Sequence, residues 1–233
     1  EGRLLRGAWV AGWGRCADDG SLVSDCIVVM TAVGREAETV PAGAGVVTVA
    51  GGIGRTNAAA ATTEAILRHG PRAVLSVGVA GVLPGSELAL GEIVVASRCV
   101  YVEEGLVTPA GFADMRGLGF PLGDFEGNAV PVSETLLARL GSIGRTGAIA
   151  TVATCSGTDD AAREVVRRTS AIAEAMEGAA VVHAARRLGV PAIEIRAISN
   201  TTGDRERQRW DLSLACDALR RAMSEALEAL RAC

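Results

Sequence analysis

The side chain with the clearest chemical potential is the carboxylate of Glu177, in the last quarter of the chain. It stands at the start of a helix predicted over residues 177–188, next to Met176 and ahead of a run of small and apolar residues. A carboxylate among apolar neighbours is costly unless it has a hydrogen-bonding partner. Because an ionised carboxylate only accepts hydrogen bonds, it suits two adjacent hydroxyl donors such as a ribose diol. The alternative is a structural acid that the helix dipole favours.

A second group of polar residues lies in and directly after an apolar strand predicted over residues 192–198. Arg196 lies inside that strand and needs a partner, which Glu194 can provide from the same face two residues earlier. Ser199 and Asn200 follow the strand. The amide of Asn200 offers both a donor and an acceptor, so it can read a ring that carries N–H beside C=O. The alternatives are a purely structural ion pair and an Asn that only forms a turn.

Glu36 follows the first predicted strand, residues 26–31, in a polar turn or short helix over residues 34–39. A Glu just past the end of a strand can act as a general base on water. The alternative is a solvated acid in the first turn of a helix, where the dipole favours it.

Two glycine-rich turns lie at predicted strand ends. The sequence Gly51-Gly-Ile-Gly54 connects a strand to a helix, which is typical of phosphate binding at a helix N-terminus. It does not follow the first strand, and no ribose-binding acid stands about 20 residues further on, so a tight structural turn is the alternative. The second turn, Gly78-Val-Ala-Gly81, would let a flat or sugar-like ligand approach the backbone. Val79 and Ala80 offer no side-chain hydrogen bonds to a phosphate.

Composition excludes several mechanisms. All 23 basic residues are Arg, so no Lys can form a Schiff base or serve a P-loop. Two His and six Cys with no clustered spacing argue against a zinc site and a Ser-His-Asp triad, and indicate free thiols in a reducing compartment. A net charge of −4 leaves no basic footprint for nucleic acid, and no long apolar run predicts a membrane span. We therefore expect a cytoplasmic protein.

Alternating strands and helices must position these side chains. Further strands are predicted over residues 46–50, 73–79, 92–102 and 146–152, and further helices over residues 55–69, 132–140, 159–168 and 212–230, with Thr158 capping the third of these helices. Residues 104–131 are predicted to form an irregular loop or lid. The alternation predicts one α/β domain over residues 26–233 with a largely parallel or mixed central sheet. Residues 1–25 are predicted to form an irregular extension, and they lack the apolar core of a secretory signal.

These motifs, in this order, resemble the nucleoside phosphorylase/hydrolase superfamily and, within it, the futalosine hydrolase family. The resemblance covers about residues 26–230 and is carried by Thr31-Ala-Val…Glu36, Gly51-Gly-Ile-Gly-Arg-Thr-Asn57, Gly78-Val-Ala-Gly81, Ala175-Met-Glu-Gly178, Arg196-Ala-Ile-Ser-Asn200 and Gly203-Asp-Arg205…Trp210. It implies a mixed sheet that is partly closed as a barrel and flanked by helices, in a homodimer or higher homo-oligomer. It also implies N-glycosidic cleavage of a small nucleoside without a metal or organic cofactor.

The resemblance implies a role for each candidate residue. Met176 and Glu177 would bind the ribose hydroxyls, Glu36 would activate water, and Asn200 would face the purine. Adenine-specific relatives carry Asp where this chain has Asn200, whereas relatives that handle 6-oxopurines such as hypoxanthine carry Asn. We assign catalysis to Glu36, Glu177 and Asn200, and substrate binding to Val79, Ala80, Gly81, Thr154, Met176, Arg196 and Ser199.

Chemistry agrees with these assignments. The transition state of glycosidic cleavage resembles a ribosyl cation, which two nearby carboxylates would favour. We therefore predict a nucleosidase that releases hypoxanthine from futalosine, in menaquinone biosynthesis. The alternatives are a methylthioadenosine/S-adenosylhomocysteine nucleosidase, a purine nucleoside phosphorylase and a non-catalytic nucleoside sensor. The amide at position 200 argues against adenine, the apolar Val79 and Ala80 argue against phosphate, and the two acids argue against a sensor.

Overall fold

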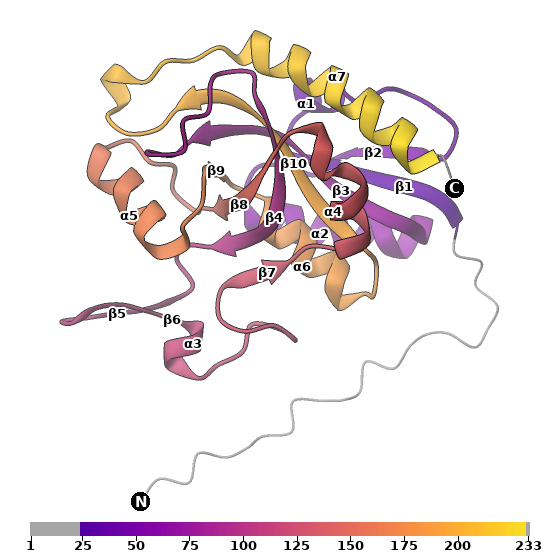
Figure 1. Ribbon diagram of the computed structural model, residues 1–233. Helices are drawn as coiled ribbons and strands as arrows, with labels where there is room; N and C mark the ends of the chain where they lie inside the picture. The colour runs from indigo at the N-terminus through magenta and orange to yellow at the C-terminus, as the bar shows by residue number, and fades with distance from the viewer. Residues whose placement is uncertain (1–23, 232–233) are drawn as a thin grey trace, which may run out of the picture.

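A mixed β-sheet that closes on itself forms the centre of the molecule (Figure 1). The computed structural model describes residues 24–231. Four strands run parallel at the core of this sheet, in the spatial order β10, β3, β1, β2: Ala192–Thr201, Pro71–Val82, Ser24–Thr31 and Val46–Ala50. Their near-continuous apolar runs, such as the buried Val28, Val74 and Ile195, are those expected of strands covered on both faces.

Three further strands complete a ring with β3 and β10. They are β4 (Ile93–Tyr101), β8 (Arg145–Thr151) and β9 (Ala173–Ala175). β10 pairs with β4 antiparallel, β4 and β8 are parallel, β8 and β9 are parallel, and β9 pairs antiparallel with β3. The sheet therefore closes into a five-stranded barrel. This confirms the α/β fold class, with a mixed sheet closed as a barrel and flanked by helices.

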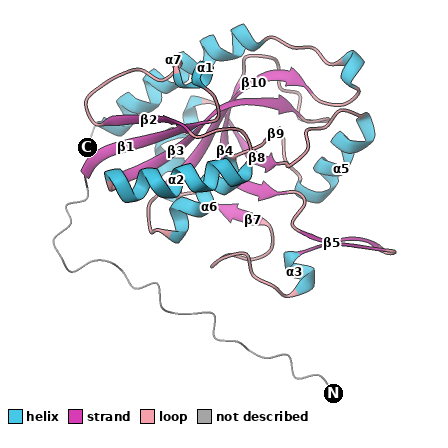
Figure 2. Ribbon diagram, turned by 180° about the vertical axis from the view of Figure 1, so that it is seen from behind, coloured by secondary structure: helices cyan, strands magenta, loops and turns pink. Residues whose placement is uncertain are grey.

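Helices cover the sheet on both sides. α2 (Arg55–His69) and α6 (Gly178–Arg187) pack against each other on one side (Figure 2). α7 (Leu212–Arg231) packs on β10 and β3 and contacts α4 (Glu134–Leu140). The remaining helical segments are α1 (Gly34–Ala37), α3 (Met115–Leu118), α5 (Asp159–Thr169), η1 (Gly141–Ile143) and η2 (Arg205–Arg207). Within residues 24–231, no helix is both long and apolar enough to cross a membrane.

Most predicted elements are confirmed, two of them residue for residue. β2 and α2 have the predicted bounds, and the hydroxyl of Thr158 accepts from Ala161 N at the start of α5, as expected of an N-cap. β1 begins at Ser24, so the last two residues of the predicted extension belong to the sheet. The rest of that extension, residues 1–23, lies outside the described residues.

The prediction of an irregular segment over residues 104–131 is wrong. It contains a hairpin of β5 (Gly105–Thr108) and β6 (Gly111–Asp114), the short helix α3, and β7 (Ala129–Pro131), which pairs with β4. Gly111 at φ +117° permits the tight hairpin turn. The strand β9 was missed because its three residues are too few to show a period.

Candidate active site

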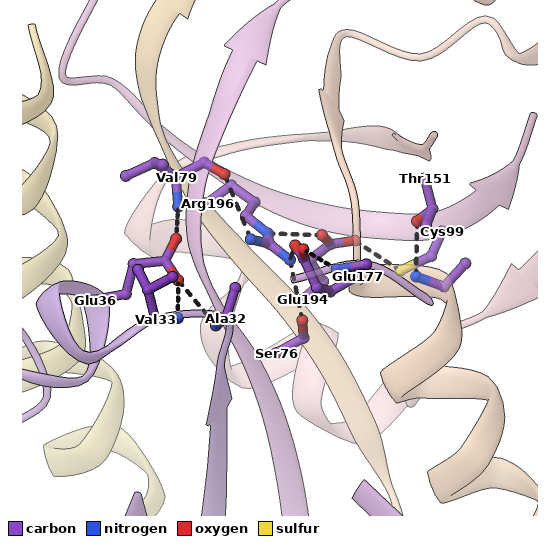
Figure 3. A network of polar contacts seen from close by, with 12 residues as sticks. Ala32, Val33, Glu36, Ser76, Val79, Cys99, Thr151, Glu177, Glu194 and Arg196 are labelled. Atoms are coloured by element: carbon purple, nitrogen blue, oxygen red, sulfur yellow. Dashed lines mark hydrogen bonds and ion pairs between the residues drawn. The ribbon is translucent and has the colours of Figure 1, made fainter. Parts of the chain in front are cut away.

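Three acidic residues and one arginine meet where the loops after β1 and β2 and the strands β3 and β10 approach the start of α6 (Figure 3). The four side chains come from three segments, α1, the start of α6 and β10, and all are at least nine-tenths buried: Glu36, Glu177, Glu194 and Arg196. Three acids around one base leave an excess of negative charge in this cluster.

Glu36 is held by backbone N–H groups. Its Oε1 accepts from Val79 N at 2.9 Å, and its Oε2 accepts from Ala32 N at 2.9 Å and Val33 N at 3.3 Å. Val33 is the N-cap of α1, so the carboxylate closes the loop that carries it. Gly78 makes this position possible, since a Cβ there would overlap Glu36 Oε1 and lie 2.5 Å from Arg196 Nη1.

Glu177 is the N-cap residue of α6 but makes no capping bond with its side chain. Instead, its Oε1 accepts from Gly54 N at 2.9 Å and its Oε2 faces Arg196 Nη2 at 3.4 Å. Gly54 has φ +88°, which turns its N–H toward Glu177 at the start of α2. The N–H that a phosphate would use therefore already binds a carboxylate, which favours the structural interpretation of the Gly51–Gly54 turn over phosphate binding.

Arg196 ties the cluster together. Its nitrogens donate to Glu194 Oε1 at 2.8 Å, Ser76 Oγ at 3.3 Å, and both Val79 O and Glu177 Oε2 at 3.4 Å. The predicted pairing with Glu194 is thereby confirmed. Burial alone would lower the pKa of the guanidinium, but the three surrounding carboxylates outweigh it and raise that pKa above its ordinary value.

Asn200 lies further along the same strand, beside Gly81. Its Oδ1 accepts from Ser199 Oγ at 2.8 Å, and its Nδ2 donates to Thr201 O at 3.0 Å. Ser199 Oγ also lies 3.3 Å from Ala80 O. These bonds assign the orientation of the amide and leave it one further acceptor site and one further N–H. β10 continues through Asn200 to Thr201, three residues beyond the predicted end, with a register shift against β3 after Ile198.

The structure therefore brings most of the predicted residues to one region. Val79, Ala80 and Gly81 of β3 contact or adjoin Glu36, Ser199 and Asn200. Met176 precedes Glu177 and is partly buried, while Thr154 is exposed in the segment after β8. The substrate-binding and catalytic roles of all these residues stay predictions.

Three further contacts shape the site and were not predicted. Thr151 Oγ1 accepts from Ala179 N at 2.8 Å and fixes the start of α6. Arg55, the first residue of α2, pairs with Glu103 at 3.3 Å and Glu104 at 2.5 Å, which ties the Gly51–Gly54 turn to the segment after β4. Ser76 supports Arg196, and its hydroxyl inside the apolar run 73–79 was a signal for a buried polar partner.

A cavity of about 410 Å³ lies apart from this cluster, between β4, β6, α3 and the end of α5. Its lining includes Arg98, Arg168, Asp114 and Glu126, so charges of both signs face it. None of the predicted site residues lines it. Its size alone does not make it the site of the chemistry.

A family model described as the phosphorylase superfamily matches residues 28–233 of the chain. This range includes Glu36, Glu177, Glu194 and Arg196. The chain belongs to the phosphorylase superfamily. The chain is 36% identical to a curated protein, the futalosine hydrolase of Thermus thermophilus, over 79% of the chain and 82% of that protein.

Two other relatives of the chain have different enzyme names. The futalosine hydrolase of Acidothermus cellulolyticus is 39% identical over 65% of this superfamily member, and the match spans 62% of that relative's own length. The 5'-methylthioadenosine/S-adenosylhomocysteine nucleosidase of Anoxybacillus flavithermus is 34% identical over 69% of the chain and 70% of its own length. A solved structure of a futalosine hydrolase mutant from Helicobacter pylori shares the fold, with a TM-score of 0.69 at 23% identity over 89% and 99% of the two chains.

Proposed function

We propose that the chain is a nucleosidase that hydrolyses the N-glycosidic bond of futalosine and releases hypoxanthine. The observation that carries the proposal is the amide of Asn200, at the end of β10 in a chain whose relatives include futalosine hydrolases. A carboxyl at this position would suit adenine. The free acceptor site and N–H of the amide suit a base that presents N7–H beside a C6 oxygen.

Glu177 is the proposed acceptor for the ribose diol. One of its oxygens binds Gly54 N and the other faces Arg196 at a distance too long for a strong charge-assisted bond. A carboxylate has about four acceptor sites, so two remain for the sugar hydroxyls. The same charge would stabilise the ribosyl cation that develops as the bond breaks.

Glu36 is the proposed general base. Its three backbone contacts fix the carboxylate next to Gly78 and Val79, and no cation within residues 24–231 lies at ion-pair distance from it. It would take a proton from water while the water oxygen bonds to C1' of the ribose. The C1'–N9 bond breaks, its electron pair passes to the purine, and N7 takes a proton from solvent to complete hypoxanthine beside Asn200. Glu36 then returns the proton of the attacking water to solvent, so that one water is consumed in each turnover.

Two alternatives keep the fold but change the chemistry. Adenine release is favoured by the identity to the Anoxybacillus nucleosidase and opposed by Asn200. Phosphorolysis is opposed by the apolar Val79 and Ala80, and by the use of Gly54 N to bind Glu177.

We further propose a cytoplasmic homodimer or higher homo-oligomer that acts in menaquinone biosynthesis. Exposed Leu106, Val107 and Phe120 are available to such an interface.

The test is incubation of the purified protein with futalosine, inosine and methylthioadenosine, each with and without phosphate, followed by detection of the free base. We expect hypoxanthine release from futalosine at a rate that phosphate does not change. Adenine release as the main activity would reject the proposal, and so would a strict requirement for phosphate.

A further inference from the structure

Glu194 is a buried acid that the proposed mechanism does not use. Its side chain has no exposed surface, and it lies on β10 two residues before Arg196. One oxygen pairs with Arg196 Nε at 2.8 Å, and the other accepts from Cys99 Sγ at 3.0 Å. Burying a third carboxylate beside two others costs desolvation free energy and adds charge repulsion, unless close ion pairs and hydrogen bonds compensate for both.

The fold makes room for this acid at one position. Gly178, the first residue of α6, directly follows Glu177, and a Cβ built on it would overlap the carboxylate of Glu194. The overlap involves Cδ and both Oε atoms, so a rotation of the carboxyl group alone does not relieve it. A glutamate at position 194 and a glycine at position 178 therefore depend on each other.

The distances show which acid neutralises Arg196. Glu194 approaches the guanidinium to 2.8 Å, whereas Glu177 stays at 3.4 Å. Both contacts are buried, where charges interact much more strongly than in water. Glu194 is thus the main counter-ion of Arg196, and Glu177 is left with charge that the guanidinium does not cancel.

We propose that Glu194 is a positioning residue that binds Arg196 and so keeps Glu177 free and anionic for the sugar of the substrate. This inference rests on the proposed function, because it assigns the sugar to Glu177. Without the charge of Glu194, Arg196 would pair closely with Glu177, compete with the ribose hydroxyls and weaken the stabilisation of a ribosyl cation.

The first test compares Glu194→Gln, which keeps the size of the side chain, with Glu194→Asp, which keeps its charge. We expect Glu194→Gln to lower kcat/KM for futalosine at least about tenfold, the effect of losing about 1.4 kcal/mol, and Glu194→Asp to lower it less. A side chain that only fills space would give the reverse order. Glu64→Gln, which removes an exposed charge on α2, is the matched control and should have wild-type activity.

A second readout isolates the charge. An iminoribitol with a protonated ring nitrogen mimics the ribosyl cation, whereas hypoxanthine is a neutral ligand of the same site. Glu194→Gln should weaken binding of the iminoribitol about tenfold and change the Kd of hypoxanthine much less. Equal effects on the two ligands, or wild-type affinity for both, would overturn the proposal.

The third test needs no substrate. Gly178→Ala should lower the melting temperature of the wild-type chain by about 5 °C or more, because the added Cβ overlaps the carboxylate of Glu194. In a Glu194→Val background the same substitution should cost little, because no carboxylate remains to overlap. Equal costs in both backgrounds would contradict the dependence of the two positions.

These outcomes separate the two proposals. If the wild-type chain leaves futalosine intact, the proposed substrate is wrong. The melting temperatures and the iminoribitol affinities would still test the proposed role of Glu194. An active wild type with an equally active Glu194→Gln would reject the positioning role alone. Should Glu194→Gln fail to fold, the double variant Gly178→Ala/Glu194→Val replaces it, since it removes the same charge without the overlap.

Discussion

Glu177 concentrates the proposed chemistry in one carboxylate. It is buried, it binds the backbone of a neighbouring loop, and it directly precedes a helix that has no room for a side chain at its first position. The same carboxylate therefore fixes a turn and, in the proposed function, offers acceptors to the ribose. Substitutions at this residue separate the two roles when size is preserved.

Glu177→Gln should lower kcat for futalosine hydrolysis at least about 1000-fold, because the neutral amide cannot stabilise a developing cation. Gln preserves the acceptor for Gly54 N, so the melting temperature should change little. Single-turnover measurement of hypoxanthine release checks the rate, and thermal unfolding provides the control. A rate near that of the wild type would remove Glu177 from the site.

Asn200→Asp should lower kcat/KM for futalosine about tenfold or more at neutral pH, since a carboxylate cannot donate to the C6 oxygen of the purine. The loss should shrink in acidic buffer as the new carboxyl group takes up a proton. Hypoxanthine release measured across pH checks both points. Cleavage of methylthioadenosine is the comparison, and an equal loss on that substrate would indicate damage to the sugar site instead.

At the scale of elements, helix ends set the boundaries of the site. Thr158 caps α5 with its hydroxyl, and Glu177 marks the start of α6. The two side chains differ in what they bind. Thr158 accepts from the backbone of its own helix, whereas Glu177 accepts from Gly54 N at the start of α2.

Thr158→Ala should lower the melting temperature by about 2–4 °C, the usual effect of losing a cap worth about 1 kcal/mol. Thr158→Ser keeps the hydroxyl and should stay close to the wild type. Neither variant should change kcat/KM, since the cap does not touch the proposed site. Equal stability of the Ala and Ser variants would mean that the Ala161 N–H finds another partner.

The sequence predicted the long elements and the pairing of Arg196 with Glu194, because both follow from simple periods along the chain. It missed β9 and the hairpin of β5 and β6, whose short strands are stabilised by pairing and packing with distant segments, such as Phe112 beneath the Arg168 guanidinium. Nor could it show that Gly178 faces Glu194, since that contact depends on how α6 lies on β10. Spacing predicts local structure, whereas contacts of this kind need the whole fold.

At the scale of the whole molecule, one buried acid, Glu174, reduces stability at neutral pH. Glu174 on β9 is buried and accepts from Ser156 N at 2.8 Å and Ser156 Oγ at 2.6 Å. Burial raises the pKa of this carboxyl group in spite of the two bonds from Ser156. A raised folded-state pKa favours the protonated acid, so stability is lost as pH rises through that pKa.

Glu174→Gln should therefore raise the melting temperature at pH 8, by about 2–4 °C for each kcal/mol of relieved desolvation. The gain should vanish below the ordinary pKa of a glutamate, where the acid is protonated in both the folded and unfolded states. Thermal unfolding at pH 4 and pH 8 checks the difference, with the exposed Glu64→Gln as control. A gain that does not depend on pH would show that packing, not charge, is responsible.

The closed ring of strands has a consequence for hydrogen exchange. β10 is bonded to β3 along its whole length and to β4 at its centre, and it carries both Arg196 and Asn200. Its amide protons should be among the slowest in the molecule to exchange with deuterium, at a rate set by global unfolding. Amides of the Gly51–Gly54 turn should exchange much sooner. The strand that carries Arg196 and Asn200 would then stay formed while the loops around the proposed sugar site open and close.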